Sequence, residues 1–141
     1  MTVPPILLSI IVCEKVIVDR FSGMGYVNGI IQTIAAPKYP ARHAMMTFFA
    51  ELTNGHGNAI FTLKIVDVIE EDKEIFSFDK IPVNFRDVKQ IGNIVFNLQG
   101  FKFPHEGEYR FQLFSGEHLL GERRIICRQI ELPKGDIHDS Q

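Results

Sequence analysis

Hydrophobic and polar residues alternate along several short stretches of this chain, and this two-residue period is what most limits its fold. The alternation is plainest at residues 44–52, 61–65, 94–98 and 109–113. Successive side chains of a β-strand point to opposite faces, so the pattern predicts strands with one face on a core. Antiparallel sheets tolerate a second face in water. No stretch has the longer period of an amphipathic helix, and we therefore expect an all-β fold.

Turn-forming sequences separate these stretches. Residues 21–25 and 53–58 are rich in Gly, Ser and Asn, residues 70–74 are charged, and residues 115–118 form a short polar break. Short strands that alternate with such turns are typical of sandwiches and barrels. We predict an antiparallel two-sheet sandwich of roughly seven to nine strands. It should form one domain over residues 1–132, followed by a polar, frayed tail at 133–141.

Two segments are harder to assign. Residues 81–92 suggest one short strand and then a loop, with a helical turn near 86–91. The register of the strand over 119–131 stays open, because Gly121 could host a bulge that exchanges its faces. The alternating stretches predict one shared core, made of Phe48, Phe61, Leu63, Ile94, Phe96, Phe111 and Leu113.

Charge and hydropathy exclude several classes of partner. The chain has 141 residues, a net charge of -2 and no run of Lys or Arg, so we do not expect it to bind nucleic acid. The apolar run at 6–13 is too short to span a bilayer, and no basic residue precedes it as in a signal peptide. We interpret this run as a buried strand and expect no membrane partner and a cytoplasmic location.

The two cysteines, Cys13 and Cys127, lie in apolar runs and have no metal-ligand spacing. We expect two buried, reduced thiols. A disulfide is the alternative if the first and last strands are neighbours.

The segment over 103–113 contains the most specific local pattern, with Tyr109 at the start of a predicted strand. In Greek-key sandwiches a tyrosine at this place bonds through its hydroxyl to the backbone a few residues upstream. We therefore predict that Tyr109 forms a tyrosine corner, which is a structural role.

Catalytic and metal-binding patterns are weak. No two of the five histidines (His43, His56, His105, His118 and His138) lie within five residues of each other, whereas zinc sites usually contain closely spaced pairs. We assign no catalytic, cofactor-binding or metal-binding residue. The acidic residues at 70–74 lack the pattern of a calcium loop and are expected to be a solvated turn.

An enzyme remains the alternative hypothesis. His56, His105 and His118 fall in predicted loops, and the loops of a sandwich gather at its two ends. These histidines, with Glu106 or Glu117, could form a small-ligand site or a metal-dependent catalytic site.

Three apolar residues lie opposite the predicted core faces. Met45, Phe49 and Phe114 could form a patch on an outer sheet face that binds a second copy or another protein.

Three motifs carry a family resemblance: CEKVIVD at 13–19, NGIIQTIAAPKYP at 28–40, and the closing FP-x-x-GEYRF hairpin with LLGER over 103–123. With these motifs the chain resembles a family of uncharacterised bacterial domains. The resemblance implies an immunoglobulin-like sandwich and no assigned activity. We expect a non-enzymatic binding or assembly module that acts through a sheet face, a sheet edge or the end loops.

Overall fold

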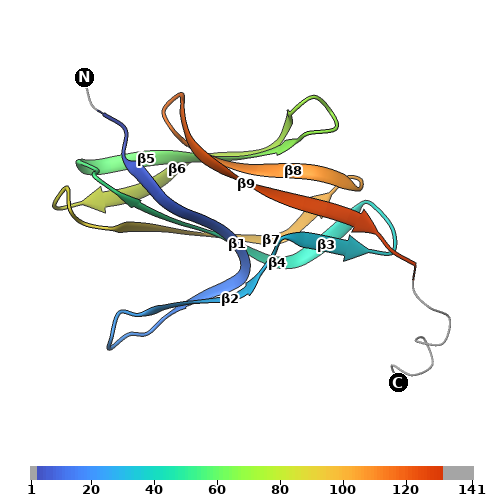
Figure 1. Ribbon diagram of the computed structural model, residues 1–141, viewed down its shortest axis with the longest axis horizontal. Helices are drawn as coiled ribbons and strands as arrows, with labels where there is room; N and C mark the ends of the chain where they lie inside the picture. The colour runs from blue at the N-terminus through green and yellow to red at the C-terminus, as the bar shows by residue number, and fades with distance from the viewer. Residues whose placement is uncertain (1–2, 132–141) are drawn as a thin grey trace.

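Nine strands make up the regular structure of residues 3–131, the part of the chain that the computed structural model describes (Figure 1). The predicted tail at 133–141 lies outside the described residues. The strands are β1 (Ile6–Val18), β2 (Gly25–Ile30), β3 (Thr33–Ala36), β4 (Ala41–Thr53), β5 (Gly57–Asp67), β6 (Lys73–Phe85), β7 (Gly92–Phe103), β8 (Gly107–Ser115) and β9 (His118–Gln129). None of the described residues forms a helix long and apolar enough to cross a membrane. The all-β prediction is confirmed.

The strands form two sheets that pack face to face. One has the order β2-β1-β4-β7, and the other has the order β3-β9-β8-β5-β6. All neighbours are antiparallel except β3 and β9, which run parallel. The order β6-β5-β8-β9 matches strands C′-C-F-G of an immunoglobulin domain, and β1-β4-β7 matches its strands A, B and E. The predicted immunoglobulin-like sandwich is confirmed.

The core lies between the two sheets and contains the residues that the alternation selected. Phe48 of β4 and Phe111 of β8 are fully buried, and their rings stack across the sandwich with centroids 6.4 Å apart. Phe96 points to the same side but is only half-buried, since it lies near the edge of its sheet against Phe76 and Phe78.

Residues 81–92 form a strand followed by a turn, as predicted, and the strand is the end of the long strand β6. Ile81, Val83 and Phe85 are all buried. Pro82 is tolerated because β6 is an edge strand, where a missing N–H need not break a ladder. The predicted helical turn at 86–91 is a non-helical turn.

The open question about the last strand is settled. In β9 the side chains of Ile125 and Cys127 face the core. The register against β8 shifts at a bulge: Leu113 pairs with Gly121, but Phe114 pairs with Leu119. Leu120 therefore has no partner residue on β8 and is the extra residue of the bulge. Leu7 of the opposite sheet packs directly against Gly121, at a place that a Cβ atom would fill.

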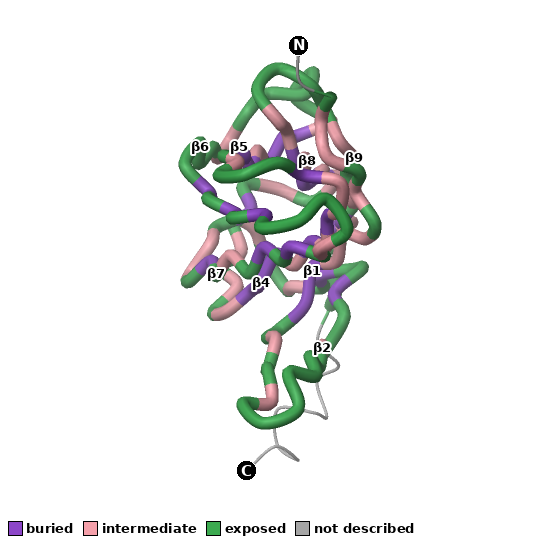
Figure 2. The backbone as a smooth tube through the Cα atoms, turned by 90° about the vertical axis from the view of Figure 1, so that its left-hand side faces the viewer, coloured by how far each residue is buried: buried purple, intermediate pink, exposed green. Residues whose placement is uncertain are grey.

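Strand β1 extends beyond the body of the sandwich. It pairs with β4 only as far as Cys13, while its last residues pair with β2 alone. The result is a two-stranded hairpin, residues 14–29, which we call the arm. Figure 2 shows the arm projecting from the body, with mostly exposed residues.

Candidate functional site

The structure does not bring the three candidate histidines together. His56, in the loop before β5, and His118, at the start of β9, line one pocket at one end of the sandwich. His105, in the loop before β8, lies beside Asp67 at the end of β5, which is the opposite end of that strand. Within residues 3–131 no three His, Cys, Asp or Glu side chains are grouped so that they could hold a metal ion.

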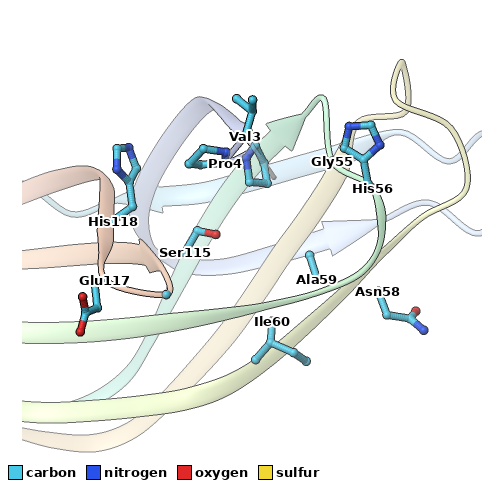
Figure 3. Close-up of a pocket in the computed structure, with 12 residues that line it drawn as sticks. Val3, Pro4, Gly55, His56, Asn58, Ala59, Ile60, Ser115, Glu117 and His118 are labelled. Atoms are coloured by element: carbon cyan, nitrogen blue, oxygen red, sulfur yellow. The ribbon is translucent and has the colours of Figure 1, made fainter. Parts of the chain in front are cut away.

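The pocket with His56 and His118 has a volume of about 580 Å³ and is open to solvent. Its polar residues include Asn58, Ser115 and Glu117, and its apolar walls come from Val3, Pro4 and Ile60. Both histidines are exposed, and they stand on opposite sides of the pocket (Figure 3). Ser115 lies directly opposite His118 in the β8–β9 ladder, but among the described residues no hydrogen bond joins the serine hydroxyl to either histidine ring.

The acidic segment at 70–74 is exposed, as expected: residues 70–72 lie in the turn between β5 and β6, and Lys73 and Glu74 begin β6. Glu71 and Asp72 have positive φ values of 57° and 59°. Glu74 lies 3.4 Å from the ammonium group of Lys64. The geometry is that of a solvated turn.

The tyrosine corner is present and carries an ion pair. Tyr109 is fully buried, its hydroxyl donates to the carbonyl of His105 at 2.6 Å, and the N–H of His105 donates back to that hydroxyl at 3.2 Å. His105 Nε2 lies 2.6 Å from Asp67 Oδ2, and its Nδ1 lies 2.7 Å from the carbonyl oxygen of Glu106. Sequence reasoning found Tyr109 but not Asp67, because nothing in the alternating pattern marks a buried carboxylate.

Both ring nitrogens of His105 therefore face oxygen acceptors, an arrangement that suits the protonated ring. Donation from Nδ1 to the Glu106 carbonyl raises the pKa of His105, burial lowers it in part, and Asp67 raises it further. Asp67 is 2% exposed, and its Oδ1 is buried without a hydrogen-bond partner. Burial raises the pKa of Tyr109 to about 12. None of Asp67, His105 and Tyr109 lines the pocket with His56 and His118, and we assign the cluster a structural role.

The two cysteines are free and buried, and they lie in different sheets. Burial raises the pKa of Cys13, with a further rise from Glu14, and burial raises the pKa of Cys127 to about 12. A thiol that is both buried and protonated is a poor nucleophile.

The three residues of the expected apolar patch lie on two different sheets. Met45 and Phe49 are half-buried on the outer face of β4, whereas Phe114 lies on β8 with the ammonium group of Lys64 4.9 Å from its ring centroid. Phe49 instead pairs across strands with Ile11 and Val95. The resulting apolar row is three residues wide and begins near the base of the arm.

The largest display of apolar side chains is on the arm, which sequence reasoning did not find. Phe21 is 97% exposed and Met24 is 56% exposed, and Ile17, Val18 and Tyr26 are also exposed. The available signal was the turn at 21–25, which contains Phe and Met where turns usually contain polar residues.

The turn that carries Phe21 is held by its own hydrogen bonds. The carboxylate of Asp19 accepts the N–H of Phe21 at 3.0 Å and the hydroxyl of Ser22 at 2.9 Å. The hydroxyl oxygen of Ser22 accepts the N–H of Met24, and the backbones of Asp19 and Met24 are also bonded. The bonds from Phe21 and Ser22 hold the pKa of Asp19 below its usual value. The tip therefore has a defined shape although the Phe21 side chain touches almost nothing.

A model of DUF6941, a family of unknown function, matches residues 8–128. The chain belongs to this family. The match covers both sheets, the arm and the tyrosine corner, so these features lie within the family domain. No curated protein of known function matches the chain.

Two solved structures share a similar arrangement of strands. One is a β-glucosidase from Listeria innocua in complex with isofagomine, with 10% sequence identity and a TM-score of 0.47. The match covers 72% of this chain and only 15% of the β-glucosidase chain. The other is an immunoglobulin-like protein from Pseudomonas aeruginosa, with 16% identity and a TM-score of 0.42 over 89% of this chain and 98% of that chain. Likeness at this level says nothing about activity, and the architecture rests on the strand pairing described above.

For this member of the family, the described residues offer two surfaces of different chemistry. The pocket at the His56 end is wet and contains exposed polar groups. The arm displays exposed apolar side chains, Phe21 and Met24 among them, on a turn that its own hydrogen bonds hold in shape. Exposed apolar groups of this kind are typical of a protein-binding surface.

Proposed function

We propose that this chain is a non-enzymatic protein-binding module of the bacterial cytoplasm, and that the arm is its main contact with a partner. The observation that carries the proposal is the exposure of Phe21 at the tip of an internally bonded turn. An aromatic side chain contributes much of its binding energy through burial. Holding it in place before binding reduces the entropy that association costs.

The position of the arm supports this role. Beyond Cys13, no third strand of residues 3–131 pairs with the arm. Isolated two-stranded hairpins are at best marginally stable in water, and they gain stability from a further strand or a packed face. A partner that covers the arm would supply both.

The row formed by Ile11, Phe49 and Val95 supplies a second region for the same partner. Val95 is exposed, while Phe49 and Ile11 are half-buried. The row is too narrow to form an interface by itself, and we place it at the rim of the contact made by the arm. Phe114 does not belong to this surface, because it lies on the other sheet.

The proposed location rests on the thiols. Cys13 and Cys127 are both free, and cytoplasmic proteins keep their thiols reduced.

The test is a comparison of tagged variants in the cell that makes the protein. Phe21→Ser and Met24→Ser should each remove any protein that co-purifies with the wild-type chain. Ile60→Ser is the matched control, because Ile60 is 54% exposed against 56% for Met24, but it lines the pocket on the other sheet. A co-purifying protein that is lost with Ile60→Ser and kept with both arm variants would contradict the proposal and move the binding site to the pocket.

A further inference from the structure

The two sheets leave four edge strands, and three of them carry features that discourage pairing with another chain. Strand β3 has four residues and is followed by Pro37 and Pro40. Strand β6 carries Pro82 and exposed charges at Lys73, Glu74, Asp79 and Lys80. Short length, proline and charge are the usual means of protecting an edge.

Strand β7 is longer and largely uncharged, but a strand of the opposite sheet runs beside it. Phe78 of β6 lies 5.1 Å from Phe96 of β7 between ring centroids, and Phe76 lies 6.0 Å from it. The sandwich therefore closes on this side, which leaves less room for a further chain.

Strand β2 is short, but it lacks the other two protections. Its six residues include no charge and no proline, and five of them are exposed. Among residues 3–131 it pairs only with β1, so within this part of the chain the N–H and C=O groups on its other side have no strand partner. An open and uncharged edge of this kind is a template for adding a strand.

Deepening the proposed function, we infer that the occupant of this edge is a second copy of the same chain. The two β2 strands would pair antiparallel about a two-fold axis, and the two four-stranded sheets would join into one sheet. The inference rests on the role proposed for the arm and adds the identity of its partner.

Charge favours the second copy. In a two-fold antiparallel pair the residues at the axis face their own copies, so a charge there would meet a like charge. Strand β2 carries no charge at any of its six positions, so no choice of axis along it creates this conflict. The neighbouring part of the arm carries Glu14, Lys15, Asp19 and Arg20, which sum to zero.

The regular part of the seam is short. Gly29 has a φ of 69° and a Cβ atom there would meet the side chain of Glu14, so the backbone departs from extended geometry at this point. Pairing therefore runs over Gly25–Asn28, with the apolar side chains of the turn packing beyond it. Such a seam is smaller than a standard interface, and we expect a reversible dimer with a dissociation constant in the micromolar range.

The decisive variant is Asn28→Glu. Asn28 lies directly opposite Lys15 within the arm, so a glutamate gains an opposite charge inside its own chain and should keep the arm folded. Across the two-fold axis the two glutamates stand at opposite ends of the seam, roughly 10 Å apart along the strands, so they repel each other when little salt screens them. We expect the dissociation constant to rise roughly fivefold at low salt and to recover when salt is added.

Gln99→Glu is the matched control, because it places the same charge on β7, the other largely uncharged edge. Sedimentation of the full chain, from micromolar to hundreds of micromolar, measures both variants. A dimer weakened by Asn28→Glu and untouched by Gln99→Glu supports the inference. The reverse result, or a wild-type chain that stays monomeric at the highest concentration, overturns it.

Single cysteines give an independent readout. A cysteine introduced at Tyr26, Val27 or Asn28 should form a disulfide with its own copy at the position closest to the two-fold axis, and a cysteine at Gln99 should not. The native thiols do not interfere, since Cys13 and Cys127 are buried. If the chain is monomeric and yet loses a co-purifying protein when Phe21 is changed, the proposed function stands and the partner is a different protein.

Discussion

The hydroxyl of Tyr109 donates a hydrogen bond of 2.6 Å to the carbonyl oxygen of His105, four residues earlier in the chain. The bond fixes the crossing from β7 in one sheet to β8 in the other. It also places the ring of His105 against Asp67, at the end of β5. The tyrosine corner therefore links β5, β7 and β8, and it positions His105 beside the buried carboxylate of Asp67.

Replacing Tyr109 by phenylalanine should destabilise the fold by about 1–3 kcal/mol. The ring would stay in the core, but the carbonyl and N–H groups of His105 would lose their partner. Urea unfolding measures the change. Tyr26→Phe on the exposed arm is the control and should cost nothing measurable; equal losses in the two variants would refute the corner.

The ion pair of His105 and Asp67 should make stability depend on pH. The folded-state pKa of His105 is raised above its unfolded value, so the pair stabilises the fold fully below about pH 6.5. This contribution is lost as the pH rises through the folded-state pKa. Glu70 also raises the pKa of His105.

The measurement is the free energy of unfolding between pH 6 and pH 9, with pH values chosen around the ordinary histidine pKa of about 6.5. In His105→Gln the free energy of unfolding should fall less steeply as the pH rises. The variant should also be less stable than the wild type near pH 6, because buried Asp67 loses its charged partner. His118→Gln, at an exposed position, should keep the wild-type slope. An unchanged slope in His105→Gln would assign the dependence to another group.

Sequence reasoning succeeded where a local pattern was sufficient. The two-residue period identified the strands around Phe48, Phe61 and Phe111, and Tyr109 at a strand start identified the corner. It predicted a strand within residues 81–92, but not that this strand is the end of the long edge strand β6, because edge position depends on which strands pair. The arm was missed for the same reason: the motif at 13–19 is part of the family resemblance, but nothing in it says that β4 stops pairing with β1 at Cys13.

The core should respond differently at its centre and at its edge. Phe111→Ala should cost about 3–5 kcal/mol, because its ring is fully buried against Phe48. Phe96→Ala should cost about half as much, because Phe96 is half-buried at the edge of its sheet. Thermal or urea unfolding of the two variants measures the ratio, and equal costs would show that Phe96 is more tightly packed than its exposure indicates.

Both thiols should be protected in the native protein. Cys13 and Cys127 are buried, and the pKa of each is raised, so a thiol reagent at neutral pH should react only as the fold opens. Denaturation without reductant should then release two reactive thiols per chain. Rapid labelling of the native protein would show that one of the sheets opens easily, and the position of the label would identify which.

Gly100 should be required for the change of pleat within β7. Before Gly100 the even-numbered side chains of β7, such as Ile94 and Leu98, face the core. After Gly100 it is the odd-numbered Phe103 that is buried. The change occurs at Gly100, which has a φ of 62°, a conformation that side chains with a Cβ atom rarely adopt. Gly100→Ala should therefore destabilise the fold by about 1–2 kcal/mol.

Two glycines separate the causes of that loss. Gly116 has a similar φ of 61° and open space around it, so Gly116→Ala reports the backbone strain alone. Gly25 has no positive φ and also faces open space, so Gly25→Ala should be close to neutral. At Gly100 a Cβ atom would also lie 2.9 Å from the mobile Nη1 of Arg42, which donates to the Gly100 carbonyl. If Gly100→Ala costs more than Gly116→Ala, that contact adds to the strain; if it costs no more than Gly25→Ala, the change of pleat does not depend on glycine.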